Sequence, residues 1–336
     1  MKITFNNGDS LVEMLRGALR EPLEALLGAD KRIFLPFLAS SAVIAAIVWA
    51  QRVRRHGRTT LLGFLFPRSI WLHRSAILDY QILFARALLK VVLFAPFFVS
   101  TIGVALAVTR VLRHSFGTID TSLSRGPVAA LFTVSAFVAD DFTRYCVHWL
   151  LHRVPWLWEI HKVHHSAEVM TPFTLHRVHP LEGFAMAVRA SITIGAVTGL
   201  FIWMFPGRVQ GWEILGVDAV SFAFALFGAN LRHSQVWWSY GPKLERIFIS
   251  PAQHQIHHSD DPRHFNRNLG AALAIWDWAF GTLYLIRGRE PLRFGLPAEV
   301  RNHENSVVSS IVGPLVASVR TLVPSRLARP RPQPGE

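Results

Sequence analysis

Three clusters of histidine with related spacing constrain this chain more than any other feature. Twelve of the sixteen histidines fall between His148 and His264. The clusters are His148-x-x-x-His152, His161-x-x-His164-His165 and His254-x-x-His257-His258. On a helix, residues i, i+3 and i+4 share one face. Each cluster is therefore predicted to lie on a helix and to direct two or three imidazoles to one point.

Metal binding is the function that this pattern favours. Neutral imidazole is a ligand of iron, zinc, copper and nickel. A single histidine is usually an ordinary surface or core residue, but packing has no use for so many imidazoles in register, because a buried polar nitrogen without a partner is costly. The three motifs hold eight histidines. This exceeds the roughly four to six ligands of one metal ion, so the sequence predicts a two-metal centre.

Apolar runs indicate an all-α integral membrane protein. The chain has 336 residues, of which 51% are hydrophobic and 17% charged, and this is little charge for a soluble protein. Because a helix needs about 20 mainly apolar residues to cross a bilayer, we expect a helical bundle with about four to five spans. The candidate spans are residues 33–50, 91–109, 126–139, 190–205 and 212–230.

The order of the spans predicts that the clusters meet. A hairpin of two spans around Pro206-Gly207 returns the chain to the side that it left, so the three clusters form a His-rich helical cap on one face of the membrane. Arginines crowd the loop after the first span, and the positive-inside rule makes that side cytoplasmic. A basic chain with a Pro-Arg tail is compatible with a bacterial inner membrane protein.

Two helices are predicted to carry the first two clusters. The first covers residues 132–152 and ends before Pro155, which breaks a helix because it lacks an amide hydrogen. The second covers residues 156–165. Asp141 lies about two turns before His148 on nearly the same face. Its carboxylate is expected to accept a ring N–H from a ligand, to cap backbone N–H groups or to pair with Arg144.

Flanking regions complete the expected organisation. We expect an interfacial amphipathic segment at residues 1–31, an N-terminal transmembrane region at 32–131 and a metal-binding domain at 132–285, which the family resemblance given below implies to be catalytic. Residues 286–336 are expected to hold a second amphipathic segment and a disordered tail. Cys146 is the only cysteine, so an intramolecular disulfide is impossible and packing is its favoured role.

Segments around the clusters resemble the fatty acid hydroxylase/sterol desaturase family. The resemblance rests on residues 148–166, 177–182 and 250–259 and on a closing motif at residues 276–284. It covers roughly residues 132–285, under half of the chain. The family implies an all-helical membrane fold with a histidine-bound di-iron centre that activates O2. Its members hydroxylate, oxidise or desaturate lipids, including sterols and fatty acids.

Carried over residue by residue, the resemblance implies ten iron ligands. They are His148, His152, His161, His164, His165, His179, His233, His254, His257 and His258. Some members have a paired H-x-x-x-H before the last cluster, where this chain has only His233, preceded by Asn230. The missing ligand is then expected from His179 or His264, or from Asn230 through a water. His176 is expected to support the site or the fold.

The expected cofactors are two non-haem iron ions, with O2 as cosubstrate and a membrane lipid as substrate. The chain has no Gly-rich nucleotide loop and no fused haem domain, so electrons are expected from a separate, ferredoxin-like donor. The formal net charge is +13. Anionic lipid and an acidic donor account for that charge, because arginines flank the apolar runs, and no nucleic acid partner is expected.

A lipid hydroxylase is the favoured function. A lipid desaturase that uses the same centre is the near alternative, and no residue decides between the two. A metal transporter is the distant alternative. Transporter sites lie near the bilayer midplane, whereas these clusters fall at the ends of the apolar runs.

Overall fold

The computed structural model describes residues 23–53, 59–89, 99–119, 123–214, 217–296 and 306–322, together with Arg16, Gly17, Arg20 and Thr121. The regular elements among these residues are helices, apart from one antiparallel pair of two-residue strands, and this confirms the expected all-α class for the described residues. In chain order the elements are α2 (Leu35–Val48), the π-helix η1 (Trp49–Val53), α3 (Leu61–Leu65), α4 (Arg68–Trp71), α5 (Arg74–Leu89), α6 (Thr101–Phe116), α7 (Arg125–Arg153), α8 (Pro155–His165), η5 (Pro172–His176), α9 (Pro180–Met204), β1 (Glu213–Ile214), β2 (Val217–Asp218), α10 (Ala219–Leu226), η6 (Ala229–His233), α11 (Gly241–Leu244), α12 (Pro251–His257), η7 (Pro262–His264), α13 (Ile275–Ala279) and α14 (Val307–Leu322), where η5, η6 and η7 are 3₁₀-helices.

Helices α7 and α8 carry the first two histidine clusters, as predicted. Between them Val154 has extended backbone angles, φ −94° and ψ 118°, and Pro155 takes the first position of α8. Proline has no amide hydrogen to continue α7, but its fixed φ suits the start of a new helix. The break therefore turns the chain and sets the two clusters against each other.

The third cluster lies on the short helix α12. Ser250 and Gln253 form a capping box, in which each side chain accepts a hydrogen bond from the other residue's backbone N–H, and this fixes the start of the helix. The Gln255 side-chain nitrogen lies within 3.0 Å of the carbonyl oxygens of Leu231, Ser234 and Val236. These contacts hold η6, and with it His233, against α12.

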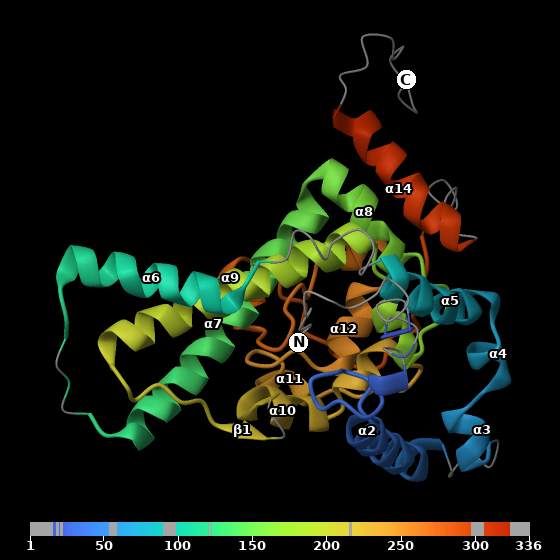
Figure 1. The fold of residues 1–336 in the computed structure, drawn as a ribbon. Coiled ribbons are helices and arrows are strands. Elements are labelled where there is room, and N and C mark those ends of the chain that lie inside the picture. Colours follow the sequence, from blue (N-terminus) through green and yellow to red (C-terminus); the bar gives the residue numbers. More distant parts are fainter. Residues whose placement is uncertain are drawn as a thin grey trace.

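Helices α6, α7 and α9 extend together to the left of Figure 1, as an arm that leads away from α8 and α12. Gly195 and Gly199 lie on α9 where it meets α6. A Cβ atom on Gly199 would lie 2.5 Å from the carbonyl oxygen of Ala105, and the Thr109 hydroxyl lies 3.0 Å from the carbonyl oxygen of Gly199. Small residues four apart let two backbones approach closely and are typical of helix pairs in membranes.

Replacing Gly199 with alanine is expected to destabilise the protein by about 1–3 kcal/mol, because the new methyl group overlaps main-chain atoms that cannot move aside. The matched control is Gly126→Ala in α7, where a Cβ meets no atom of the described residues within 4 Å. Thermal unfolding in detergent measures both variants. Equal midpoints would contradict the close packing of α6 on α9.

One helix in the described part of the chain, α9, is long and apolar enough to span a bilayer. Shorter apolar helices cover Leu35–Gln51, Leu61–Trp71 and Val307–Leu322. The predicted run 126–139 lies inside α7. Run 91–109 continues into α6, with residues 91–98 outside the described residues.

The predicted span at residues 212–230 is wrong as a membrane-crossing helix. The strands β1 and β2 take up its first part, and the helix that follows, α10, has 8 residues. At 1.5 Å per residue such a helix is about 12 Å long, well short of a bilayer. Asp218 accepts the backbone N–H of Ser221 and starts the helix late, and Gly228, at φ 85°, follows its end. The described residues that follow α9 therefore include no second helix long enough to span a bilayer.

Helix α14 lies within residues 286–336, where a second amphipathic segment is expected. It packs against α8, where the Ser318 hydroxyl donates to the carbonyl oxygen of Trp156 at 2.7 Å. Most of the expected N-terminal amphipathic segment, and the tail from residue 323 onward, lie outside the described residues.

Candidate metal centre

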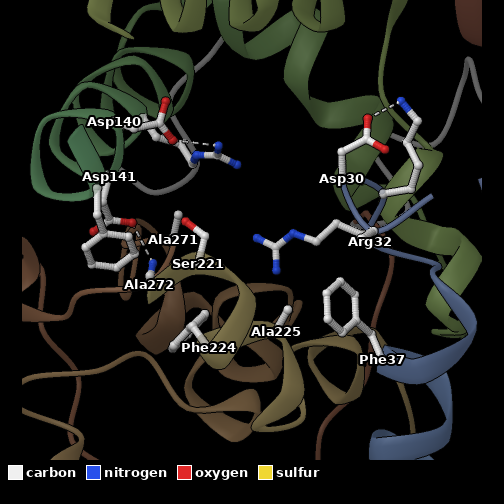
Figure 2. A pocket seen from close by; sticks show the side chains of 14 residues that line it. Asp30, Arg32, Phe37, Asp140, Asp141, Ser221, Phe224, Ala225, Ala271 and Ala272 are labelled. Carbon is white, nitrogen blue, oxygen red and sulfur yellow. Dashed lines mark hydrogen bonds and ion pairs between the residues drawn. The ribbon is translucent and has the colours of Figure 1, made fainter. Parts of the chain in front are cut away.

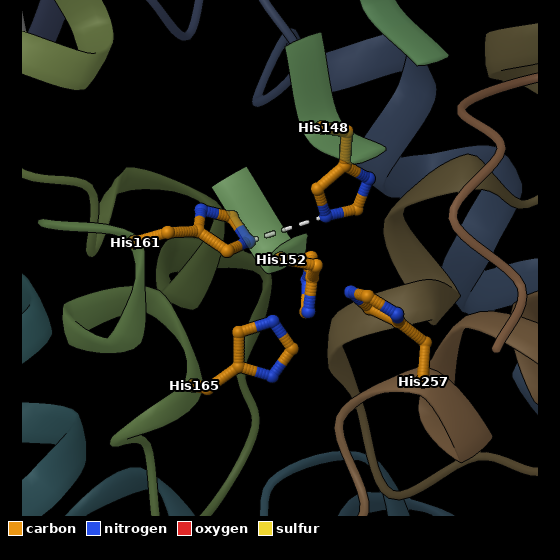
Figure 3. A group of neighbouring side chains, drawn as sticks. All are labelled: His148, His152, His161, His165 and His257. Atoms are coloured by element: carbon orange, nitrogen blue, oxygen red, sulfur yellow. Dashed lines mark hydrogen bonds between the residues drawn. The ribbon is translucent and has the colours of Figure 1, made fainter. Parts of the chain in front are cut away.

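Nine of the ten histidines expected as ligands gather in two groups. Within each group, one ring nitrogen of every member lies within 4.8 Å of those of the others. Group one is His148, His152, His161, His165 and His257, and group two is His164, His233, His254 and His258. Figure 3 shows the five rings of group one arranged around one space.

Each H-x-x-H-H motif is shared between the two groups. The i and i+4 residues of the motif on α8, His161 and His165, belong to group one, and the i+3 residue His164 belongs to group two. The motif at α12 divides in the opposite sense, because His257 alone joins group one. The two groups are therefore neighbours, and the rings of His165 and His258 stack with their centroids 4.6 Å apart.

The nitrogen spacing in group two fits a metal ion. The Nε2 atoms of His233, His254 and His258 lie 3.1 to 3.3 Å from one another. Two nitrogens bound to one ion at about 2.0–2.1 Å, with angles between about 90° and 109°, are separated by about 2.9–3.4 Å. The three rings thus already have the separation of donors on a common ion.

Hydrogen bonds at Nδ1 leave Nε2 free to bind a metal. The Nδ1 atoms of three histidines face backbone carbonyl oxygens: His148 faces Leu269 at 2.6 Å, His164 faces Arg177 at 3.2 Å, and His257 faces Arg267 at 2.9 Å. A carbonyl oxygen can only accept, so Nδ1 carries the proton and Nε2 carries the lone pair.

Several Nε2 atoms have no protein partner. Those of His152, His165 and His257 are buried, and no described residue gives them a hydrogen bond. The Nε2 atom of His148 lies 3.2 Å from that of His161. Buried lone pairs without donors are costly, and a shared cation satisfies all of them. The residues therefore fit a metal in each group.

Burial keeps these rings neutral. It lowers the pKa of His148, His161 and His164 to about 3, since an imidazolium loses its hydration inside the protein. At neutral pH no proton competes with a metal for the Nε2 lone pair.

Glu182 supports group one, although the sequence reasoning assigned it no role. It lies in the first turn of α9, is buried, and its Oε1 accepts the Nδ1–H of His161 at 3.0 Å. Such a carboxylate orients a ligand ring and makes it more basic. The sequence feature that could have indicated this role is its position within the motif of residues 177–182.

Replacing Glu182 with leucine is expected to lower metal affinity by about 10–100-fold, because His161 loses the partner that holds its ring. Glu182→Gln keeps an acceptor oxygen and is expected to lose less. Competition with a chelator, read by elemental analysis, ranks the variants. An order in which the glutamine variant loses as much metal as the leucine variant would contradict this role.

Of the three roles expected for Asp141, the structure shows the one in which its carboxylate caps backbone N–H groups, and neither the bond to a ligand ring nor the pair with Arg144. Its carboxylate accepts the backbone N–H groups of Ala272 and Leu273, at 2.8 and 3.0 Å, and the indole N–H of Trp276 at 3.0 Å. Arg144 pairs instead with Asp140. Asp141 therefore fastens the start of α13 to α7, because those donors precede or open that helix and have no partner within it.

The structure does not bring His179 to either group. Its Nδ1 accepts the backbone N–H of Leu181 as the cap of α9, and its Nε2 lies 2.9 Å from the carbonyl oxygen of Ile311. Both ring nitrogens are therefore engaged away from the metal centre, and the expectation that His179 is a ligand is wrong.

The other supporting candidates also lie outside the two groups. His264 pairs with Glu290 at 3.2 Å, and the amide of Asn230 donates to the carbonyl oxygen of Arg32 at 2.9 Å. The backbone carbonyl of His176 accepts from Arg86. None of these residues supplies the missing ligand; Asn230 acts instead by tying η6 to the segment before α2.

Asn268 was also missed, and it shapes the loop that holds two ligand rings. Its φ is 53°, in the left-handed region that asparagine tolerates. Its side chain donates to the carbonyl oxygen of Gln253 and accepts the backbone N–H of Tyr284. The neighbouring carbonyl oxygens of Arg267 and Leu269 then face His257 and His148.

Comparison with known proteins agrees with this geometry. Residues 133–282 match the profile of a family described as Fatty acid hydroxylase. This segment lies within the catalytic region expected at residues 132–285 and holds all nine histidines of the two groups. No solved structure matches the chain.

Three relatives illustrate the range of the similarity. The alkylglycerol monooxygenase of Homo sapiens is 30% identical over 148 residues, 44% of this chain and 29% of that protein. The ornithine lipid hydroxylase of Rhizobium tropici is 30% identical over 158 residues, 46% of this chain and 42% of that protein. The Delta(7)-sterol 5(6)-desaturase of Candida dubliniensis is 28% identical over 153 residues, 45% of this chain and 34% of that protein. The similarity thus spans less than half of each relative.

Proposed function

We propose that the protein is a membrane-bound, O2-dependent oxidoreductase that hydroxylates a C–H bond of a lipid. The premise is the match of residues 133–282 to the fatty acid hydroxylase family. Two non-haem iron ions, one in each histidine group, are the proposed cofactors. The observation that carries the proposal is the convergence of nine imidazoles into two groups. Within each group the donor nitrogens lie within 4.8 Å of one another.

The donor set supports iron. All the donors are neutral ring nitrogens, and Cys146 belongs to neither group. Structural zinc usually takes four ligands, whereas group one holds five histidines. Iron bound in these groups would supply the activation of O2 and the oxidation of the lipid C–H bond.

The protein residues hold and shield the centre. The carbonyl oxygens of Arg177, Leu269 and Arg267 and the carboxylate of Glu182 each fix one ring through its Nδ1–H. All histidines of the groups are buried except His148 and His152, which are half-buried. Such burial excludes bulk water from the reacting lipid.

Exposed apolar side chains on the arm support a membrane location. Ile102, Val111 and Phe116 on α6 are 63 to 71% exposed, and Val134 on α7 and Ile192 on α9 are about half exposed. Apolar surface of this kind favours contact with lipid, and α9 has the length to cross the bilayer. We propose that the arginine-rich segment after residue 50 and the metal centre both face the cytoplasm, and that the membrane is a bacterial inner membrane.

The names of the relatives indicate the class of substrate. They refer to an alkylglycerol, an ornithine lipid and a sterol, all of them lipids. We therefore place the oxidised C–H bond in a lipid. Converting a C–H group and O2 into an alcohol and water takes up two electrons and two protons, so a reductant is required.

A basic surface groove is the proposed docking site for an acidic electron-donor protein. Arg246, Arg267 and Arg287 line the groove together with Trp278, which is 72% exposed. The carbonyl oxygen of Arg267 accepts the Nδ1–H of His257 in group one. Arg267 therefore both lines the groove and contacts a histidine of the metal centre, which gives an electron a short route from the groove to the metal.

Turnover with an acidic ferredoxin-type donor is expected to fall about 10-fold or more between low and high ionic strength, because salt screens the attraction that brings the partners together. Arg287→Gln is expected to weaken this dependence, and Arg113→Gln, exposed on α6, is the control of equal charge. Donor oxidation followed by absorbance measures the rates. A rate independent of salt would contradict the docking site.

The function is tested by metal analysis and by product analysis. We expect about two irons per chain by elemental analysis, coupled in Mössbauer spectra, and incorporation of oxygen from ¹⁸O2 into a lipid alcohol. Zinc alone, or no O2-dependent product, would overturn the proposal. The sterol desaturase relative supports a second candidate, a desaturase, whose product is lighter by two hydrogens and carries no ¹⁸O.

A further inference from the structure

A cavity of about 190 Å³ is lined by charged and apolar residues outside the two histidine groups. Its walls come from α2 and the segment before it, from α7, from α10 and from the residues that precede α13. Phe37, Phe137 and Phe224 make the apolar part, and Arg32, Asp140 and Arg144 are among the charged residues that line it. The cavity thus offers charge and apolar surface to one ligand.

Arg32 directs an unpaired guanidinium into this cavity. Figure 2 shows its guanidinium in the open centre, and no residue in the described part of the chain pairs with it. The carboxylates that line the cavity are engaged by other groups: Asp30 pairs with Lys31 at 2.8 Å, and Asp140 pairs with Arg144 at 3.0 Å. Asp140 also pairs with Arg189 at 2.8 Å. Asp141 accepts N–H groups of Ala272, Leu273 and Trp276. The guanidinium of Arg32 is therefore left without a direct ion-pair partner among the described residues, and Asp140 and Asp141 act on it only through space.

The surroundings of Arg32 favour an anion. Burial, and then the positive charges of Arg232 and Arg144, lower the pKa of Arg32 to about 9, which leaves it protonated at neutral pH. An anion next to the guanidinium would offset both effects. A planar guanidinium is suited to a carboxylate or a phosphate, because it donates two parallel hydrogen bonds.

The cavity is joined to both histidine groups. Arg144 precedes His148 of group one by four residues on α7, a rise of about 6 Å. Asn230, whose amide donates to the carbonyl oxygen of Arg32, precedes His233 of group two in η6. Two residues at the cavity, Arg144 and the Asn230 that contacts Arg32, are therefore each three or four residues away in sequence from a histidine of the metal centre.

We propose that this cavity is an oxyanion site that binds a carboxylate or phosphate group through Arg32. The proximity of the two histidine groups suits the anionic head of the lipid whose chain is oxidised, and this assignment of the head rests on the proposed function. A free anion of the same chemistry is the other source of the group.

Binding of matched amphiphiles tests the site without turnover. Myristate and myristyl alcohol share a chain and differ in the charge of the head. Arg32→Gln is expected to weaken the binding of myristate about 10-fold or more and to leave that of the alcohol unchanged. Arg113→Gln removes an exposed arginine of α6 and is expected to change neither. Calorimetry in neutral detergent, with iron measured on the same samples, gives the values.

Equal affinity of wild type and Arg32→Gln for myristate, or equal loss of myristate and alcohol, would overturn the oxyanion site. Inorganic phosphate distinguishes the sources. Displacement of myristate by millimolar phosphate from wild type supports a site open to free anions, and retention of myristate supports the lipid head. If the protein holds no iron but still binds myristate in an Arg32-dependent way, the oxyanion site is supported and the proposed oxygenase function is contradicted.

Discussion

Replacing His164 with alanine is expected to remove the metal of group two and to lower O2-dependent turnover by at least about 100-fold. Loss of a residue that only orients a ligand already costs about 10–100-fold, and His164 is placed as a ligand itself. The effect is not expected to stop at group two, because His165 of group one is the next residue on α8. Iron per chain and the rate of lipid oxidation are the measurements.

The control for His164→Ala is a histidine that lies outside both groups. His179→Asn keeps a side-chain acceptor to cap α9, and the structure engages both nitrogens of His179 elsewhere. Its iron content is expected to equal that of wild type. Loss of iron from this variant, or full activity in His164→Ala, would contradict the assignment of the ligands.

Replacing Asp79 with leucine is expected to destabilise the protein by about 3–5 kcal/mol, because it leaves the guanidinium of Arg177 buried without a counter-charge. The two side chains are 0 to 2% exposed, and the ion pair measures 2.9 Å. Arg177 also donates to the carbonyl oxygen of Val163 and the hydroxyl of Ser166, so it ties the end of α8 to α5. Chemical unfolding in detergent measures the loss.

Two further variants distinguish the cost of a buried unpaired charge from a general loss of stability on substitution. Asp79→Leu combined with Arg177→Met is expected to recover part of the stability, since no unpaired charge remains. Arg263→Ala breaks an exposed pair with Asp261, leaves Asp261 as the cap of η7, and is expected to leave stability unchanged. A double variant as unstable as Asp79→Leu alone would show that shape, and not charge, governs this region.

The features of this protein that can be predicted from its sequence follow mostly from the spacing of neighbouring residues, above all the histidines. The helices of the first two clusters follow from their histidine positions and from Pro155, and the structure has them at Arg125–Arg153 and Pro155–His165. Nine of the ten expected ligands meet in the two groups. Regular helical geometry explains this success, because i, i+3 and i+4 fix which rings share a face.

Residue spacing does not predict contacts between segments that are distant in the sequence. The partners of the ligand rings are mostly backbone carbonyls, which every residue possesses, so no side chain reveals them. Leu269, which faces His148, is far away in the chain. His179 illustrates the opposite error: it lies in a motif typical of the family, but it caps a helix. Apolar runs likewise predicted a span at residues 212–230, where Asp218 and Gly228 limit the helix to 8 residues.

The sharing of each H-x-x-H-H motif between the groups has a mechanical consequence. Metals in both groups would act as two cross-links between α8 and α12, and each would close the long stretch of chain from His165 to His254. A cross-link of this kind limits the freedom of the unfolded chain. Since neither helix can leave one ion without disturbing the other, uptake and release of the two metals should be cooperative, with the half-loaded protein as the rare species.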